Sequence, residues 1–122
     1  MRVLVVDDDE IFCRFLVEAL EDVGISANCT TSGLAAYELM TCDPCDLCII
    51  DVRMPLILGT ELAEAIQEEY PRAKIILASA FADQALREYA RRKEILLLSK
   101  PFTKLELFDT VQLALRDSME RN

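Results

Sequence analysis

Carboxylates follow two apolar runs of the chain. Asp7 and Asp8 come directly after residues 3–6, and Asp51 comes directly after residues 47–50. If both runs are buried parallel strands, these carboxylates meet at the carboxyl edge of one sheet. Carboxylate oxygens, with water completing the shell, are the ligands that Mg²⁺ prefers. The sequence therefore predicts a divalent-metal site, for Mg²⁺ or Mn²⁺, with one carboxylate left for chemistry.

Alternating elements must position these residues. Apolar strand-like runs alternate with amphipathic helical stretches, which is typical of an α/β protein with a parallel sheet covered on both faces. Strands are predicted at residues 2–6, 26–30, 46–50, 74–79 and 95–98, and helices at 10–23, 33–40, 59–70, 82–92 and 104–119. In such open sheets ligands bind beyond the carboxyl ends of the strands, where the strand order reverses.

Helix boundaries are marked by capping residues. Asp9 directly precedes the apolar stripe of the first helix, so we interpret it as a cap rather than as a metal ligand. Ser32 is a second predicted cap and Thr103 a third, while Gly24 and Pro71 end the helices before them.

Bulk properties narrow the functional classes. The 122 residues predict one domain, 1–122, and no apolar stretch is long enough for a membrane span. The net charge of −9 argues against a nucleic-acid surface. The chain starts directly in a predicted strand, so no signal peptide is expected. Five cysteines, an odd number, then predict reduced thiols and a cytoplasmic protein.

Polar residues also end the fourth and fifth predicted strands. Ser79 ends the fourth, and Ser99 and Lys100 follow the fifth. If the first and third strands are neighbours, the carboxylates converge with a hydroxyl and an ammonium group alongside.

The chain resembles the receiver domain of two-component response regulators. The resemblance covers essentially the whole chain. It is carried by Val5-Val6-Asp7-Asp8, Asp51-Val52-Arg53-Met54-Pro55 with Gly59, Ser79-Ala80, and Lys100-Pro101-Phe102. It implies a flavodoxin-like, doubly wound (βα)5 fold with a five-stranded parallel sheet in the order 2-1-3-4-5.

The resemblance also implies roles for the polar residues. Asp51 is the expected phosphoacceptor, with Ser79 hydrogen-bonding the new phosphoryl group and Lys100 pairing with it. Asp8 is expected to ligate Mg²⁺ directly and Asp7 largely through water. The metal set is completed by Asp51 itself and the backbone carbonyl of Arg53. The family further leads us to expect a cis Lys100–Pro101 bond.

The implied function is that of a signalling domain rather than an enzyme. Its phosphodonor is expected to be a sensor histidine kinase or a histidine phosphotransfer protein, and the domain promotes its own phosphorylation and dephosphorylation. The face formed by the fourth helix, the fifth strand and the last helix is the expected switching surface and a possible homodimer interface. No membrane partner is expected.

Three segments depart from the family pattern. Leu97 stands where most receivers carry an aromatic residue, so an aromatic switch is absent. Residues 91–94 lack the usual Gly-Ala, which predicts an irregular turn. Residues 56–58 are all apolar, and they either form a partner surface or fold down onto the domain.

Two other functions stay open. Asp7-x-Asp9 mimics the nucleophile motif of haloacid-dehalogenase-like, Mg²⁺-dependent phosphohydrolases, although 122 residues leave no room for that family's additional core and cap. A degenerate receiver that only binds proteins is the other alternative. The spacing Cys42-x-x-Cys45-x-x-Cys48 looks like a metal motif. However, no fourth ligand has matching spacing and there is no histidine, so free thiols are the better interpretation.

Repulsion within the acidic set has a measurable consequence. Two carboxylates about 5 Å apart repel by roughly 3 kcal/mol at an effective dielectric constant near 20. We therefore expect Mg²⁺ to raise the unfolding midpoint, and Asp8→Asn to raise it in metal-free buffer.

Overall fold

Five strands and five helices alternate along the part of the chain that the structure describes, as predicted. The computed structural model describes residues 1–120, and side chains as far as residue 116. The elements are β1 (Arg2–Val6), α1 (Glu10–Asp22), β2 (Ser26–Thr30), α2 (Gly33–Cys42), β3 (Leu47–Asp51), α3 (Gly59–Glu69), β4 (Lys74–Ser79), α4 (Gln84–Arg92), β5 (Leu96–Ser99) and α5 (Lys104–Glu120).

The strands form one parallel sheet in the order β2-β1-β3-β4-β5. This order confirms the expected flavodoxin-like topology. The central strand β3 pairs with β1 on one side and with β4 on the other, with Val6 beside Ile50 and Asp51 beside Ala78. Side chains that follow β1 and end β3 therefore meet at the same edge of the sheet.

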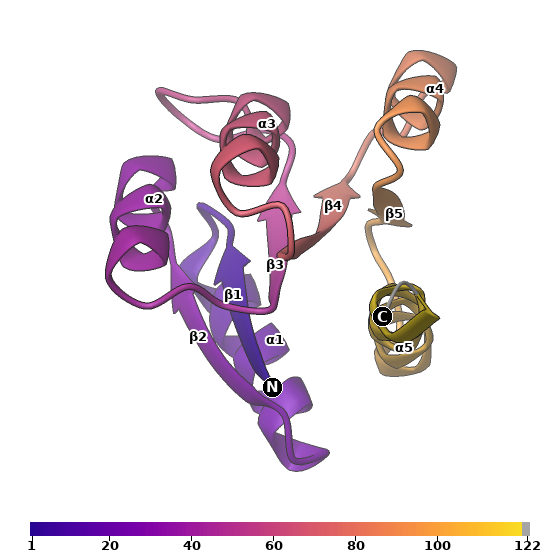
Figure 1. Cartoon of the computed structure of the whole chain (residues 1–122). Helices are drawn as coiled ribbons and strands as arrows, with labels where there is room; N and C mark the ends of the chain where they lie inside the picture. Colours follow the sequence, from indigo (N-terminus) through magenta and orange to yellow (C-terminus); the bar gives the residue numbers. More distant parts are fainter. Residues whose placement is uncertain (121–122) are drawn as a thin grey trace.

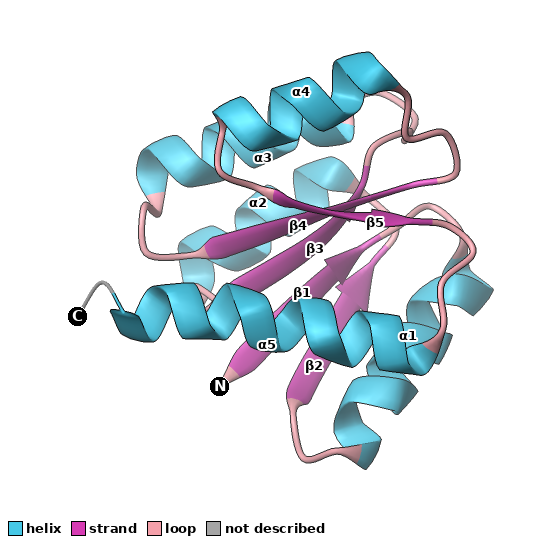
Figure 2. Ribbon diagram, turned by 90° about the vertical axis from the view of Figure 1, so that its right-hand side faces the viewer, coloured by secondary structure: helices cyan, strands magenta, loops and turns pink. Residues whose placement is uncertain are grey.

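Helices cover both faces of the sheet. Helices α1 and α5 lie on one face, and α2, α3 and α4 lie on the other (Figures 1 and 2). Each face has its own apolar core. All five residues of β3 are buried, with Leu47 and Ile49 facing α1 and α5 and with Cys48 and Ile50 facing α2 and α3. The strand that carries Asp51 is thus packed from both sides.

The helix starts follow the capping chemistry. Asp9 Oδ1 accepts hydrogen bonds from the backbone N–H groups of Ile11 and Phe12, at 3.1 and 3.2 Å, which confirms Asp9 as the cap of α1. Helix α4 begins two residues later than predicted, because Asp83 Oδ1 caps it by accepting from Leu86 N at 2.9 Å.

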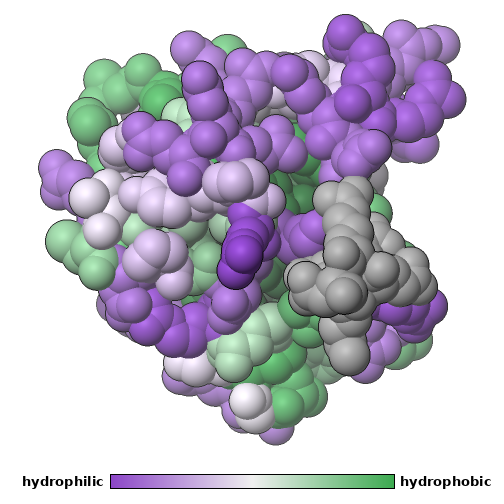
Figure 3. Space-filling model, viewed as in Figure 1, coloured by the Kyte–Doolittle hydropathy of each residue, from purple (hydrophilic) through white to green (hydrophobic). Residues whose placement is uncertain are grey.

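The segments that depart from the family pattern lie in different environments. Leu97 is half-buried against the core under α2, α3 and α4. The turn before β5 is irregular, as predicted, since Glu94 has φ +57°. Leu56 is fully exposed whereas Ile57 packs against the core, so residues 56–58 divide between solvent and the domain. In Figure 3 an apolar area covers the position of this loop, at the upper left.

Within the described residues, none of the helices combines the length and the apolar character needed to cross a membrane.

Candidate functional site

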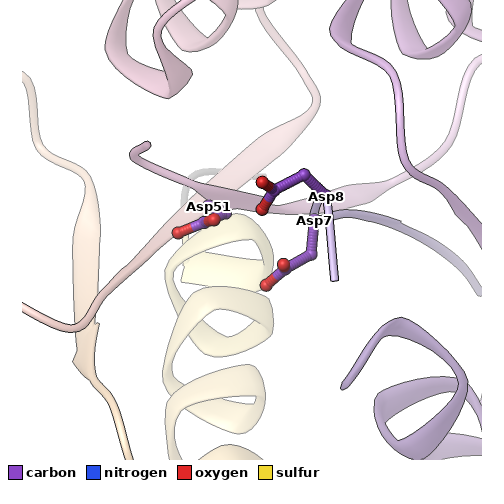
Figure 4. Close-up of side chains that lie close together, drawn as sticks. All are labelled: Asp7, Asp8 and Asp51. Carbon is purple, nitrogen blue, oxygen red and sulfur yellow. The ribbon is translucent and has the colours of Figure 1, made fainter. Parts of the chain in front are cut away.

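Three carboxylates gather where β1 and β3 end (Figure 4). One oxygen from each of Asp7, Asp8 and Asp51 lies within 4.8 Å of the others. Asp7 and Asp51 are buried, at 2% and 8% exposure, because they directly follow or end strands that are covered on both faces. Asp8 is exposed at the outer side of the cluster. The predicted acidic set is therefore brought together at the carboxyl edge.

Lys100 contacts both buried carboxylates. Its Nζ lies 2.7 Å from Asp7 Oδ2 and 3.4 Å from Asp51 Oδ1. Lys100 reaches this position from the end of β5, and its bond to Pro101 is cis, as expected. The ammonium also lies 4.5 Å from the ring centroid of Phe12, within the range of a cation–π contact. The lysine thus offsets part of the negative charge that the strand ends bury.

Burial and neighbouring charges shift the pKa values of Asp51 and Lys100. Burial, followed by the charge of Asp7, raises the pKa of Asp51 to about 6, although Lys100 opposes this shift. Burial tends to lower the pKa of Lys100, but its hydrogen bond to Asp7 and the charges of Asp7 and Asp51 outweigh burial, so that pKa is raised. Near neutral pH the site therefore holds ionised Asp51 beside a firmly protonated lysine.

Ser79 ends β4 with its side chain nearly buried, at 3% exposure. The Phe81 backbone N–H donates to Ser79 Oγ at 3.0 Å. Because a hydroxyl both accepts and donates, this bond occupies an acceptor position and leaves the hydroxyl proton available. In register, Asp51 pairs with Ala78, which places Ser79 one residue beyond Asp51 on the neighbouring strand.

The backbone after Asp51 turns sharply into α3. Gly59 N–H donates to the carbonyl of Val52 at 2.8 Å, and a Cβ at Gly59 would overlap the carbonyl oxygen of Asp51. Glycine is needed here because of close backbone approach. Arg53, whose carbonyl was predicted as a metal ligand, lies in this turn with an exposed side chain.

The donor set fits a hard divalent cation. Both Asp7 oxygens are already engaged, since Oδ1 accepts from Asp9 N at 2.9 Å and Oδ2 accepts from Lys100. The expectation that Asp7 reaches the metal largely through water stays a prediction. The oxygens of Asp8 and Asp51 are hard ligands of the kind Mg²⁺ selects.

Sequence reasoning missed the role of Phe12. It was assigned only to the apolar stripe of α1, but its ring also lies against Lys100 and packs on Phe102, with centroids 5.4 Å apart. The signal available in the sequence was only its position, three residues after the helix cap.

Comparison with known proteins agrees with this geometry. The family model for the response regulator receiver domain matches residues 3–112. The response regulator receiver protein CpdR of Brucella abortus is 35% identical over 112 residues, covering 91% of this chain and 93% of that protein. The regulatory protein AtoC of Escherichia coli is 30% identical over 116 residues, covering 94% of this chain but 25% of that protein.

Solved structures show the same fold. A CheY-like receiver domain protein from Methanospirillum hungatei superposes with a TM-score of 0.92 at 20% identity, covering 99% of this chain and 98% of that one. The receiver domain of an HD domain-containing protein from Pseudomonas fluorescens gives 0.89 at 26% identity, covering 98% and 97%. The chain belongs to the response regulator receiver domain family of two-component signal transduction.

Proposed function

We propose that Asp51 accepts a phosphoryl group from the phosphohistidine of a sensor histidine kinase or a histidine phosphotransfer protein. A carboxylate oxygen of Asp51 forms the new bond to phosphorus as the bond from phosphorus to the imidazole nitrogen breaks. The electron pair leaves on that nitrogen, and the products are an aspartyl phosphate and a histidine. A small acyl phosphate can act as donor in the same way.

The observation that carries the proposal is the setting of Asp51. Its carboxylate is nearly buried, yet it lies at the strand edge with Lys100 on one side and two further carboxylates on another. Phosphoryl transfer depends mainly on positioning and on neutralising charge. This arrangement supports Asp51 as the nucleophile, Lys100 as a fixed cation and the acidic set as the site for a bound cation.

The neighbouring residues then have distinct tasks. Lys100 pairs with an oxygen of the phosphoryl group, and the Ser79 hydroxyl donates its free proton to another. Asp8, Asp51 and the carbonyl of Arg53 hold Mg²⁺, with Asp7 acting through water. When bound, the cation supplies positive charge to the transferring phosphoryl oxygens.

A shallow hollow beside Lys100 is the surface on which a phosphodonor protein would dock. It has a volume of about 320 Å³ and is lined by Asp9, Phe12, Ala80, Lys100, Pro101 and Phe102. Its apolar members suit a protein surface that presents a histidine, because interface cores favour aromatic and apolar contacts.

We also propose that phosphorylation acts on the face formed by α4, β5 and α5. Helix α4 exposes Arg87, Arg91 and Arg92, and α5 exposes Glu106 and Asp109. These opposite charges suit a symmetric pairing of two copies. Light scattering with and without beryllofluoride and Mg²⁺ tests this, and a monomer under both conditions would rule out the homodimer.

The direct test is the intact mass of the protein before and after acetyl phosphate with Mg²⁺. Wild type should gain one phosphoryl group, and Asp51→Asn should gain none. Asp9→Asn keeps a capping side chain and should react as wild type does. A chelator should suppress the reaction.

Other outcomes would point to the alternative functions. Steady release of phosphate from a monoester, lost in Asp7→Asn and kept in Asp51→Asn, would favour a phosphohydrolase. Failure to bind beryllofluoride with Mg²⁺ would favour a receiver that only binds proteins.

A further inference from the structure

Three sulfur atoms meet at the amino end of β3, away from the acidic site. Cys45 Sγ lies 3.2 Å from Cys48 Sγ and 3.3 Å from Met40 Sδ, and Cys48 Sγ lies 3.9 Å from Met40 Sδ. Met40 and Cys48 are fully buried, and Cys45 is 9% exposed. We refer to Met40, Cys45 and Cys48 as the sulfur triad.

The fold explains why these residues meet. Met40 lies in the last turn of α2, Cys45 comes just before β3, and Cys48 is the second residue of β3 on the face that α2 covers. The backbone N–H of Cys45 also donates to Met40 Sδ at 3.5 Å, which keeps that sulfur turned toward the pair. Cys42 was the third member of the spacing in the sequence, but it is exposed at the end of α2.

The size of the triangle suits a bound metal ion. Metal–thiolate bonds are about 2.3 Å long, so three sulfurs around a central ion lie about 4 Å apart. The contact between Cys48 and Met40 already has nearly that length, and the two contacts of Cys45 must lengthen by about 0.7–0.8 Å. Thiolate and thioether ligands are soft and select soft ions such as Cu(I). Structural zinc sites use four ligands, all of them cysteine or histidine, and a thioether is not among them.

The site has routes to the surface. Cys45 lines two hollows, and the smaller one, of about 80 Å³, is also lined by Met40 and Arg2. The guanidinium of Arg2 at this opening pairs with the carboxylate of Asp43, which lines the same hollow.

We propose that Met40, Cys45 and Cys48 form a binding site for one Cu(I) ion. Binding transfers no electron: the two cysteine sulfurs bind as thiolates, their protons leave to solvent, and the thioether completes a three-coordinate shell. The site is separate from the acidic cluster, because Cys48 and Asp51 lie about 10 Å apart along the strand.

The test is competition for Cu(I) under anaerobic, reducing conditions against the coloured chelator bicinchoninate. Exposed Cys29 and Cys42 would also bind copper, so both are first replaced by serine in the full chain. This two-serine variant should retain one equivalent of Cu(I), and the same variant with Cys45→Ala and Cys48→Ala should retain none. Adding Met40→Leu instead should weaken binding about tenfold, because the thioether is lost while volume is kept.

A second measurement does not depend on the chelator. One equivalent of Cu(I) should raise the urea midpoint of the two-serine variant, because a ligand that binds only the native state stabilises it. It should leave the double-alanine variant unchanged. Asp51→Asn should bind Cu(I) as wild type does, which separates this site from the proposed phosphoacceptor.

Three results would overturn the proposal. The first is equal copper retention with and without the two cysteines. The second is no retention by the two-serine variant. The third is formation of a Cys45–Cys48 disulfide in air, seen as a loss of two hydrogens by mass, without anaerobic copper binding; the pair would then be a redox pair. If the double-alanine variant does not fold, Cys48→Ala alone and Met40→Leu carry the comparison.

Discussion

Strand β3 buries a charged side chain at its carboxyl end and an uncharged sulfur side chain near its amino end. Asp51 ends the strand at 8% exposure, and Cys48, three residues earlier, is fully buried. A buried carboxylate costs free energy unless it is paired, and Lys100 provides the pair. A buried thiol behaves as a small apolar group and needs no counter-charge. Changes at the carboxyl end should therefore act through charge, and changes at the amino end through packing.

The largest effect is expected for removal of the cation. Lys100→Met leaves Asp7 and Asp51 without their counter-charge, so we expect the metal-free protein to lose about 3 kcal/mol of unfolding free energy. The matched control is Lys93→Met. That lysine pairs at 3.5 Å with exposed Glu64 and should cost less than about 1 kcal/mol. Equal losses in urea melts would contradict a charge-balanced carboxyl end.

The next largest loss of stability is expected for a change in the backbone turn that follows the carboxyl end of β3. Gly59→Ala pushes a methyl group into the carbonyl of Asp51, and we expect a loss of about 2–3 kcal/mol. Gly24→Ala meets no atom within 4 Å but has φ +82°, so strain alone should cost about 1 kcal/mol. A smaller loss at Gly59 than at Gly24, measured by urea unfolding, would show that the turn after β3 yields easily.

Protonation of Asp51 should make the stability difference between wild type and Asp51→Asn depend on pH. Because its pKa is raised to about 6 in the folded protein, the folded state binds the proton more tightly than the unfolded chain does. That stabilising effect is complete below about pH 4 and is lost as the pH rises through 6. In metal-free buffer, Asp51→Asn should therefore match wild type near pH 4 and exceed it by about 1–2 kcal/mol above pH 7. Urea melts across this range test the effect, and a difference independent of pH would contradict it.

Repulsion at the edge of the site should give a smaller effect. Asp8→Asn removes an exposed charge from the acidic set, so metal-free stability should rise by about 1 kcal/mol. Mg²⁺ should raise the urea midpoint of wild type more than that of Asp8→Asn. Identical midpoints with and without Mg²⁺ in wild type would indicate that no preformed acidic pocket exists.

The smallest effect is expected at the amino end. Met40→Leu conserves volume in the core and should cost less than about 1 kcal/mol, with no dependence on pH between 5 and 7. A loss as large as that of Lys100→Met would mean that the sulfur contacts hold the fold together.

Short-range sequence patterns were sufficient to predict the strands and helices, because apolar runs and helix caps each depend on only a few neighbouring residues. Apolar runs located the strands within one residue, and Asp9 and Ser32 both cap the helices assigned to them. The start of α4 was misplaced because residues 81–83 have no apolar periodicity of their own, and the Asp83 hydrogen bond decides the start.

Long-range contacts were harder to predict. The family resemblance grouped Asp7, Asp8, Asp51, Ser79 and Lys100, but no local pattern indicates that Lys100 pairs with Asp7, 93 positions away. The sulfur triad shows the same limit. Spacing suggested Cys42, whereas the direction in which α2 ends brings in Met40 and leaves Cys42 at the surface.

The central place of β3 has a consequence for local opening. Its backbone pairs with strands on both sides, while β2 and β5 each have one neighbour in the sheet. Amide hydrogens of β3 should therefore exchange with deuterium only when the whole domain unfolds, and those of the outer strands should exchange earlier by fraying. The Asp51 carboxylate is attached to the part of the molecule that opens last, so its position should persist while the outer strands and the loops rearrange.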